Sequence, residues 1–141
     1  MQKRPYGTTG IDLSIIGFGG ILVTNTELSE ASRLVARAVD HGINYFDVAP
    51  SYGNAEACLG PALEPYRNDV FLACKTTERS RQGAEREMMQ SLETMRSQHF
   101  DLYQLHAMTT QEDFDSAMAL DGALLFLIEA RDKGLIRHIS F

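Results

Sequence analysis

The sequence has few cysteines, and this excludes a fold held together by disulfides. Only two of its 141 residues are cysteines, Cys58 and Cys74, and their separation matches no metal-binding motif. No secretory signal precedes them, because the basic residues near the start are not followed by an apolar run. We therefore expect a cytoplasmic protein in which both thiols are reduced.

Long apolar runs and an excess of basic residues are also absent. No segment approaches the roughly 20 apolar residues that a membrane-spanning helix needs. Thirteen Lys and Arg residues stand against 19 Asp and Glu, for a net charge of -6. Because nucleic acids and anionic membranes are bound through basic patches, we expect neither as a partner. An anionic cofactor remains compatible, since a single pocket can be basic on an acidic protein.

What is present is the composition of an ordinary globular domain. The chain is 44% hydrophobic and 23% charged, and its length is sufficient for one domain with a real core. No linker, low-complexity tract or change of composition divides it. We therefore interpret residues 1–141 as a single domain.

Apolar, strand-like runs alternate with segments of helical periodicity along most of the chain. The runs occupy residues 15–20, 43–48, 70–75, 100–106 and 136–141, and the helical segments begin near residues 28, 54, 83, 110 and 123. Such alternation predicts an α/β fold of parallel strands joined by right-handed crossovers, which a doubly wound sheet and a barrel both satisfy. Two short segments around residues 7–10 predict an N-terminal β-hairpin before the first of these strands.

Helix ends carry recognisable signals. Ser29 is a candidate N-cap for the first long helix, and Gly42 is well placed as the residue that ends it. Thr110 and Asp113 have the spacing of a capping box, which predicts that a further helix begins there.

Three of the predicted strands end on an ionisable residue. Asp47 closes the second strand, Lys75 the third and His106 the fourth. Active sites of parallel α/β folds form at this carboxyl edge, because the loops after the strands gather there. Side chains alternate between the two faces of a strand, so the three groups should converge inside a barrel mouth. The residues predicted to share their face are Tyr45, Ala73 and Gln104.

Tyr52 makes the pattern specific. Asp47 stands five residues before the pair Tyr52 and Gly53, which resembles the signature of the aldo-keto reductase family. Lys75 and His106 complete that family's catalytic tetrad in the right order. Residues 16–20, 42–47 and 134–140 resemble its first, second and fifth strands. The resemblance implies a TIM-type (β/α) barrel of which only the first half is present, preceded by the hairpin.

The resemblance also implies an activity, the NAD(P)H-dependent reduction of aldehydes or ketones to alcohols. Carbonyl reduction needs a proton on oxygen, and a phenol with a pKa near 10 gives one up more easily beside an ammonium. Tyr52 would donate this proton, Lys75 would assist it, Asp47 would hold Lys75, and His106 would orient a small carbonyl substrate. The hydride must come from NADPH or NADH, since no side chain supplies one. Gly19, Gly20 and Asp47 are the candidate cofactor contacts.

Each of these residues has an ordinary structural reading when taken alone. Residues 17–20 lack the third glycine of a dinucleotide-binding fingerprint, so they do not indicate a Rossmann site. Arg79 and Arg81, after the third strand, could contact a phosphate or lie in a solvated loop. His41, His99 and His138 have no partners at metal-ligand spacing, and we predict no metal site.

The number of strands leaves two functional interpretations. A complete barrel has eight strand-helix units in about 250 residues, and this chain reaches a fifth strand. In the family, most of the cofactor site lies on later strands, so we expect that C-terminal half to be missing here. The chain would then be a truncated oxidoreductase that binds NADPH weakly. The alternative is a non-catalytic half-barrel that associates with itself or with its missing half.

Overall fold

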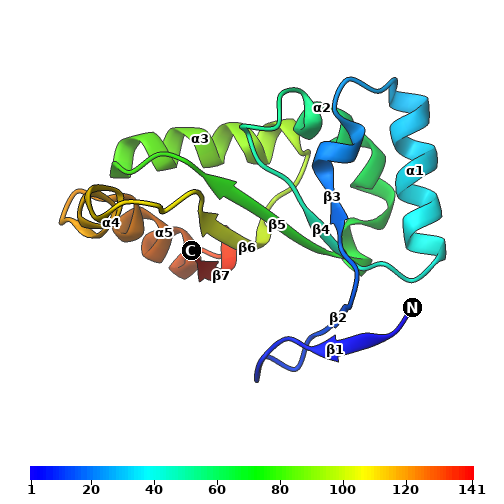
Figure 1. Ribbon diagram of the computed structural model, residues 1–141, viewed down its shortest axis with the longest axis horizontal. Helices are drawn as coiled ribbons and strands as arrows, with labels where there is room; N and C mark the ends of the chain where they lie inside the picture. The colour runs from blue at the N-terminus through cyan, green and yellow to red at the C-terminus, as the bar shows by residue number, and fades with distance from the viewer.

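A five-stranded parallel sheet is the centre of the fold. The computed structural model describes residues 1–141, and neighbouring strands of the sheet follow one another in chain order (Figure 1). The strands are β3 (Phe18–Gly19), β4 (Tyr45–Asp47), β5 (Phe71–Thr76), β6 (Phe100–Leu105) and β7 (Ile136–Ser140). All four pairings are parallel. Chain order and parallel pairing confirm the expected partial barrel and exclude the doubly wound arrangement, in which the strand order reverses.

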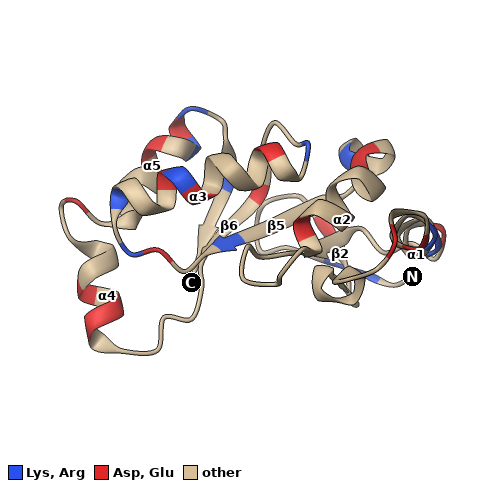
Figure 2. Cartoon of the chain, turned by 90° about the horizontal axis from the view of Figure 1, so that it is seen from above, with Lys and Arg blue, Asp and Glu red and all other residues tan.

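Helical segments connect successive strands. They are η1 (Gly20–Val23), α1 (Leu28–Asp40), α2 (Ala55–Leu63), η2 (Glu64–Asp69), α3 (Arg81–Thr94), α4 (Gln111–Met118) and α5 (Ala123–Asp132). Figure 2 shows basic and acidic residues mixed along α3 and α5, and Arg81 of α3 lies 2.5 Å from Glu129 of α5. None of these helices has both the length and the apolar character that crossing a membrane requires.

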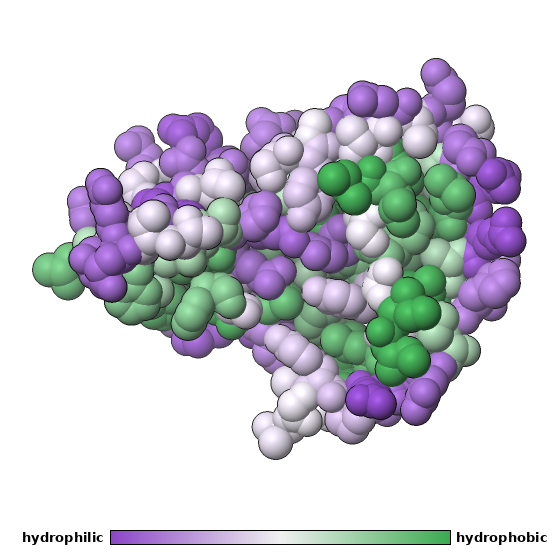
Figure 3. Space-filling model, viewed as in Figure 1, coloured by the Kyte–Doolittle hydropathy of each residue, from purple (hydrophilic) through white to green (hydrophobic).

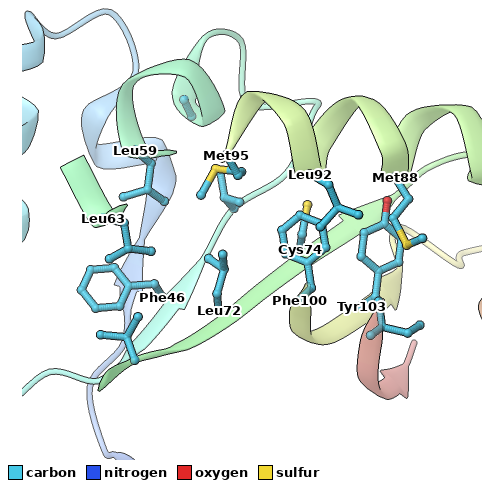
Figure 4. Close-up of a cluster of buried hydrophobic side chains, with 14 of the residues drawn as sticks. Phe46, Leu59, Leu63, Leu72, Cys74, Met88, Leu92, Met95, Phe100 and Tyr103 are labelled. Carbon is cyan, nitrogen blue, oxygen red and sulfur yellow. The ribbon is translucent and has the colours of Figure 1, made fainter. Parts of the chain in front are cut away.

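The main hydrophobic core lies between the outer face of the sheet and the helices. Phe46, Leu72 and Tyr103 point from three strands toward α2 and α3, where they meet Leu59 and Met88 (Figure 4). All five side chains are fully buried. The alternation of side chains along each strand therefore faces the direction that the sequence predicted.

The N-terminal hairpin covers the inner face of the sheet. Its strands β1 (Lys3–Pro5) and β2 (Asp12–Ser14) are antiparallel, which confirms the predicted hairpin. The Tyr6 ring beside β1 lies 5.4 Å from the rings of Phe71 and His138. Ala73 is completely buried as a result. The inner face around Ala73 is therefore not open at this end, contrary to what five strands without a closed barrel suggest.

Two of the three predicted helix-end signals are confirmed. Gly42 follows α1 with φ +81°, a conformation that glycine adopts without strain, and Thr110 and Asp113 form the predicted capping box on α4. The prediction for Ser29 is wrong, because α1 begins one residue earlier, at Leu28. Glu27 occupies the N-cap position and its side chain makes no capping hydrogen bond.

Candidate active site

Lys75 and Asp47 form an ion pair at the carboxyl edge of the sheet. Asp47 pairs with Ala73 on the neighbouring strand, so Lys75, two residues further along, reaches across to it. Its Nζ lies 2.7 Å from both carboxylate oxygens, but only Oδ2 has the geometry of a hydrogen bond. Oδ1 is buried and has no hydrogen-bond partner. One acceptor of this pair is therefore unused.

The surroundings of Lys75 keep it charged. Its side chain is only 10% exposed, and burial by itself would lower the pKa of the ammonium. The hydrogen bond and the charge of Asp47, with a smaller contribution from Tyr52, outweigh that effect and raise the pKa above its usual value. Lys75 is therefore a fixed cation over the whole neutral range.

Tyr52 lies in the turn that follows β4. Its N–H donates to the Ala49 carbonyl at 3.0 Å, and its own carbonyl accepts the hydroxyl of Thr24 at 3.1 Å. Gly53 follows with φ +63°, which lets the chain turn sharply into α2. Nζ of Lys75 lies 5.5 Å from the centre of the Tyr52 ring. The phenol is thus held beside the buried cation.

His106 brings the fourth predicted residue to the same place. It follows the last residue of β6, and its backbone N–H donates to the Thr76 carbonyl at 2.8 Å, which continues the pairing of β5 with β6. Its ring meets the Tyr52 ring edge to face, with centroids 6.1 Å apart. Its Nδ1 is buried and has no hydrogen-bond partner. Asp47, Tyr52, Lys75 and His106 therefore form one cluster.

The two glycines predicted to contact a cofactor have different surroundings. A Cβ on Gly20 would lie 2.9 Å from Cγ2 of Val48 and 3.0 Å from the Asp47 carbonyl oxygen, so close packing on β4 already requires this glycine. A Cβ on Gly19 would meet only the side chain of Ile21, at 3.9 Å. Gly19 pairs with Asp47 across the sheet. Of the two, only Gly19 has open space beside the cluster.

Arg79 is not a solvated loop residue. Its side chain is 16% exposed and its Nε lies 2.9 Å from Oδ1 of Asp113. Its Nη2 donates to the carbonyl oxygens of His106 and Ala107. These contacts join residues about 30 positions apart, so no local pattern in the sequence indicates them. Arg81, the other arginine of this loop, pairs with Glu85 and Glu129.

Other features of the surface and interior do not compete with this cluster. A hollow of about 710 Å³ lies on the outside of α3 and is lined by none of the four residues. No group of three or more His, Cys, Asp or Glu side chains is arranged to hold a metal ion. The cluster combines a phenol, a buried ammonium, a carboxylate and an imidazole, which is a set suited to moving a proton at a polar bond.

Known proteins resemble the chain in sequence and in fold. The model of the Aldo/keto reductase family matches residues 15–141. The oxidoreductase YqkF and the aldo-keto reductase YhdN, both from Bacillus subtilis, are each 30% identical to it; the alignments cover 98% and 99% of this chain but 47% and 46% of theirs. The holo form of aldo-keto reductase AKR11C1 from Bacillus halodurans superposes with a TM-score of 0.84 and 29% identity, over 99% of this chain and 49% of that one. The chain thus spans about half the length of these relatives.

Proposed function

Because the chain belongs to the aldo/keto reductase family, we propose that it carries the catalytic cluster of an oxidoreductase that reduces small aldehydes or ketones to alcohols. The observation that carries this proposal is the buried Lys75 ammonium, paired with Asp47 and 5.5 Å from the centre of the Tyr52 ring. No purely structural ion pair needs a phenol and an unpartnered imidazole beside it.

Tyr52 is the proton donor in this proposal. A phenol with an ordinary pKa near 10 is a weak acid at neutral pH. A neighbouring cation stabilises the phenolate that remains after the proton has left, and so eases the transfer. Lys75 supplies that charge, and Asp47 keeps the ammonium in place and protonated. The imidazole of His106, against the edge of the Tyr52 ring, binds the carbonyl oxygen and turns it toward the phenol.

The residues of this chain fit the reacting end of a nicotinamide cofactor, NADPH or NADH. Gly19 and Gly20 with Asp47 would hold that end beside Tyr52, and the open side of Gly19 leaves room for it. A nicotinamide supplies the hydride that no side chain can provide. The phosphates of such a cofactor need cations, and Lys75 and Arg79 at this edge are already paired with Asp47 and Asp113. Residues 1–141 alone should therefore bind NADPH weakly, as a fluorescence titration would show.

The experiment that tests the activity is Tyr52→Phe, measured in the full-length protein. NADPH oxidation is followed with a panel of small aldehydes and ketones. Loss of the proton donor should lower kcat by about 10²- to 10⁴-fold and leave the circular dichroism spectrum unchanged. Tyr66→Phe is the matched control, because Tyr66 packs beside the core on η2, outside the cluster. A Tyr52→Phe variant as active as the control would exclude the proposed role.

A second role, in association, is favoured by the two ends of the sheet. β3 and β7 each pair with one neighbour only. Large apolar side chains beside both strands are exposed, and the space-filling view shows apolar patches on this face (Figure 3). The exposed side chains are Ile15, Ile16, Ile21 and Leu22 near β3, and Phe114 and Phe141 near β7. Unpaired strand edges recruit further strands, and apolar patches of this kind mark interaction surfaces.

We propose that these edges bind either a second copy of the chain or a polypeptide corresponding to the other half of its relatives. Analytical ultracentrifugation of residues 1–141 tests this directly, and a dimer or larger species is expected. Ile16→Lys and Leu22→Lys should shift the distribution toward the monomer, whereas Leu28→Lys, at an equally exposed position on α1, should leave it unchanged. A monomer that stays monodisperse at high concentration would contradict the association.

A further inference from the structure

The backbone just after His106 adopts a conformation that needs support. Ala107 has φ +54°, in the left-handed region. A Cβ makes this conformation unfavourable for an L-residue, whereas glycine adopts it without strain. The sequence places alanine there, directly beside a residue of the proposed catalytic cluster. Contacts elsewhere in the fold must therefore stabilise the turn.

A single arginine, mostly removed from water, provides these contacts. Nη2 of Arg79 donates to the carbonyl oxygen of His106 at 2.7 Å and to that of Ala107 at 3.0 Å. These are the two carbonyls on either side of the left-handed turn. Charged donors make stronger hydrogen bonds than neutral ones, and the Arg79 side chain is largely removed from water. The guanidinium thus clamps the turn from the neighbouring loop.

Asp113 fixes the clamp in turn. Its Oδ1 accepts from Nε of Arg79 at 2.9 Å, and its Oδ2 accepts from the backbone N–H and the hydroxyl of Thr110 at the start of α4. The hydrogen bonds from Thr110, followed by that from Arg79, lower the pKa of this carboxyl. Asp113 therefore stays charged at neutral pH and holds the planar guanidinium in one orientation.

The imidazole of His106 has no comparable support of its own. Its Nδ1 has no hydrogen-bond partner, and its ring contact is with Tyr52. Its position therefore depends on the backbone that carries it. We propose that Arg79 is a positioning residue, which places the His106 imidazole against Tyr52 by clamping the carbonyls of His106 and Ala107. The catalytic value of this placement rests on the proposed function; the placement itself does not.

Nuclear magnetic resonance of the histidine ring protons in residues 1–141 tests the placement without any activity. The His106 signal is assigned by its loss in His106→Gln. In Arg79→Gln and Arg79→Lys we expect this signal to shift and broaden, because lysine keeps the charge but cannot reach two carbonyls and a carboxylate together. Asp113→Asn should produce a smaller shift in the same signal. Arg131→Gln is the matched control, since Arg131 pairs with exposed Asp132 on α5, and it should leave the His106 signal unchanged.

A second variant separates placement from stability. Ala107→Gly relieves the left-handed strain, so the double variant Arg79→Lys, Ala107→Gly should recover folding stability while the His106 signal stays displaced. If the double variant instead restores the wild-type signal, or if Arg79→Lys leaves it unmoved, Arg79 only offsets strain and the inference is wrong. In the protein that contains this chain, Arg79→Lys should lower kcat by about 10²-fold with little change in KM. If Tyr52→Phe proves as active as its control, the proposed function fails, but the effect of Arg79 on the His106 signal is unaffected.

Discussion

Two aspartates at opposite ends of the sheet pair with cations in very different ways. Asp101 lies at the amino end of β6 and its side chain is 3% exposed. Arg67 and Arg137 lie 3.1 Å and 2.8 Å from its carboxylate oxygens, and Oδ2 also accepts the backbone N–H of Leu72 at 2.9 Å. Asp47, at the carboxyl end of β4, is 28% exposed and has one cation, Lys75.

The difference separates a carboxylate that joins several elements of the fold from one that holds a single ammonium. Every strong acceptor position of Asp101 is used, and its partners tie η2, β5 and β7 to β6. A buried carboxylate whose oxygens all have partners is not available to bind another group. Asp47 leaves Oδ1 without a hydrogen bond, at the edge where active sites form. The two residues therefore differ in exposure, in the number of cations and in the number of hydrogen bonds that their oxygens accept.

The largest effect on stability is expected at the amino end of the sheet, where Asp101 lies. Asp101→Asn keeps the shape of the side chain but leaves Arg67 and Arg137 without a counter-charge. Loss of one partner from a buried pair lowers the free energy of unfolding by about 3–5 kcal/mol, and urea denaturation measures it. Asp132→Asn, which removes a carboxylate that is 66% exposed, should cost less than about 1 kcal/mol. Equal losses of stability in the two variants would show that the buried ion pairs of Asp101 stabilise the fold no more than an exposed ion pair does.

Asp47→Asn should have a smaller effect on stability and a larger one on activity. It leaves the Lys75 ammonium with a weaker acceptor, which should lower the free energy of unfolding by about 1–3 kcal/mol at pH 7. The folded pKa of Lys75 is raised above its ordinary value of 10.5. The stability that this shift contributes is fully present below pH 10.5 and is lost as pH rises through the folded pKa.

Urea denaturation of both proteins at neutral and strongly alkaline pH checks this prediction. The wild type should lose stability above pH 10.5 more steeply than Asp47→Asn, so that the difference between them narrows. A constant difference across this range would show that Lys75 does not depend on Asp47 for its charge. On the proposed function, Asp47→Asn should also lower carbonyl reduction at every pH.

The sequence predicts the carboxyl edge well because its signals are local. Asp47, Lys75 and His106 each end an apolar run, and alternation along a strand is enough to give their common face. The amino end was not predicted. Asp101 lies in an apolar strand, as Asp47 does, but its partner Arg67 lies on a 3-10 segment that no periodicity in the sequence predicts. The sequence around Asp101 and the sequence around Arg67 do not indicate that tertiary packing pairs these two residues.

The inner face of the sheet shows the same limit. The hairpin itself follows from short strands around glycines, but its docking on Phe71 and Ala73 depends on where Tyr6 reaches after folding. The Arg79 contacts with His106 and Asp113 are a further case, since they span loops from different strands. Local patterns thus predict the elements and the direction of their side chains. Which side chains contact one another across different elements depends on tertiary packing.

A buried carboxylate without any cation extends the comparison. Glu56 on α2 is 9% exposed, and the thiol of Cys74 donates a hydrogen bond to it, with Sγ 3.6 Å from Oε1. Burial raises the pKa of this carboxyl, Ser91 and Cys74 beside it partly oppose the rise, and the charge of Glu87 makes a smaller upward contribution. An acid with a raised folded pKa gives full stability below its ordinary value of 4.5, and stability is lost as pH rises through the folded pKa.

Glu56→Gln should therefore stabilise the protein at pH 7, by roughly 1 kcal/mol, and the gain should vanish near pH 4. Urea denaturation at the two pH values measures it. Glu64→Gln is the control, since this carboxylate is 56% exposed and pairs with Arg96, and it should change little at either pH. A Glu56→Gln variant that is less stable than the wild type at pH 7 would show that the buried carboxylate has an unseen favourable partner.

The smallest expected effect concerns His99, a third neighbour of Asp101. Its Nε2 lies 3.7 Å from Oδ1 and forms no hydrogen bond. Burial, followed by the charge of Arg67, lowers the pKa of this imidazole below 6.5, and Asp101 only partly opposes them. His99 is therefore neutral at pH 7, so His99→Gln should change the free energy of unfolding by less than about 0.5 kcal/mol there.

The contribution of His99 to stability should become measurable at acidic pH. Because the folded pKa of His99 lies below the unfolded one, the unfolded chain takes up this proton first as pH falls below 6.5. The wild type then loses stability between pH 6.5 and the folded pKa, and His99→Gln does not. Thermal unfolding of the two proteins at pH 7 and near pH 5 measures the divergence. If the wild type instead gains stability relative to the variant on acidification, Asp101 attracts the protonated imidazole more strongly than Arg67 repels it, and the carboxylate is not saturated by its two arginines.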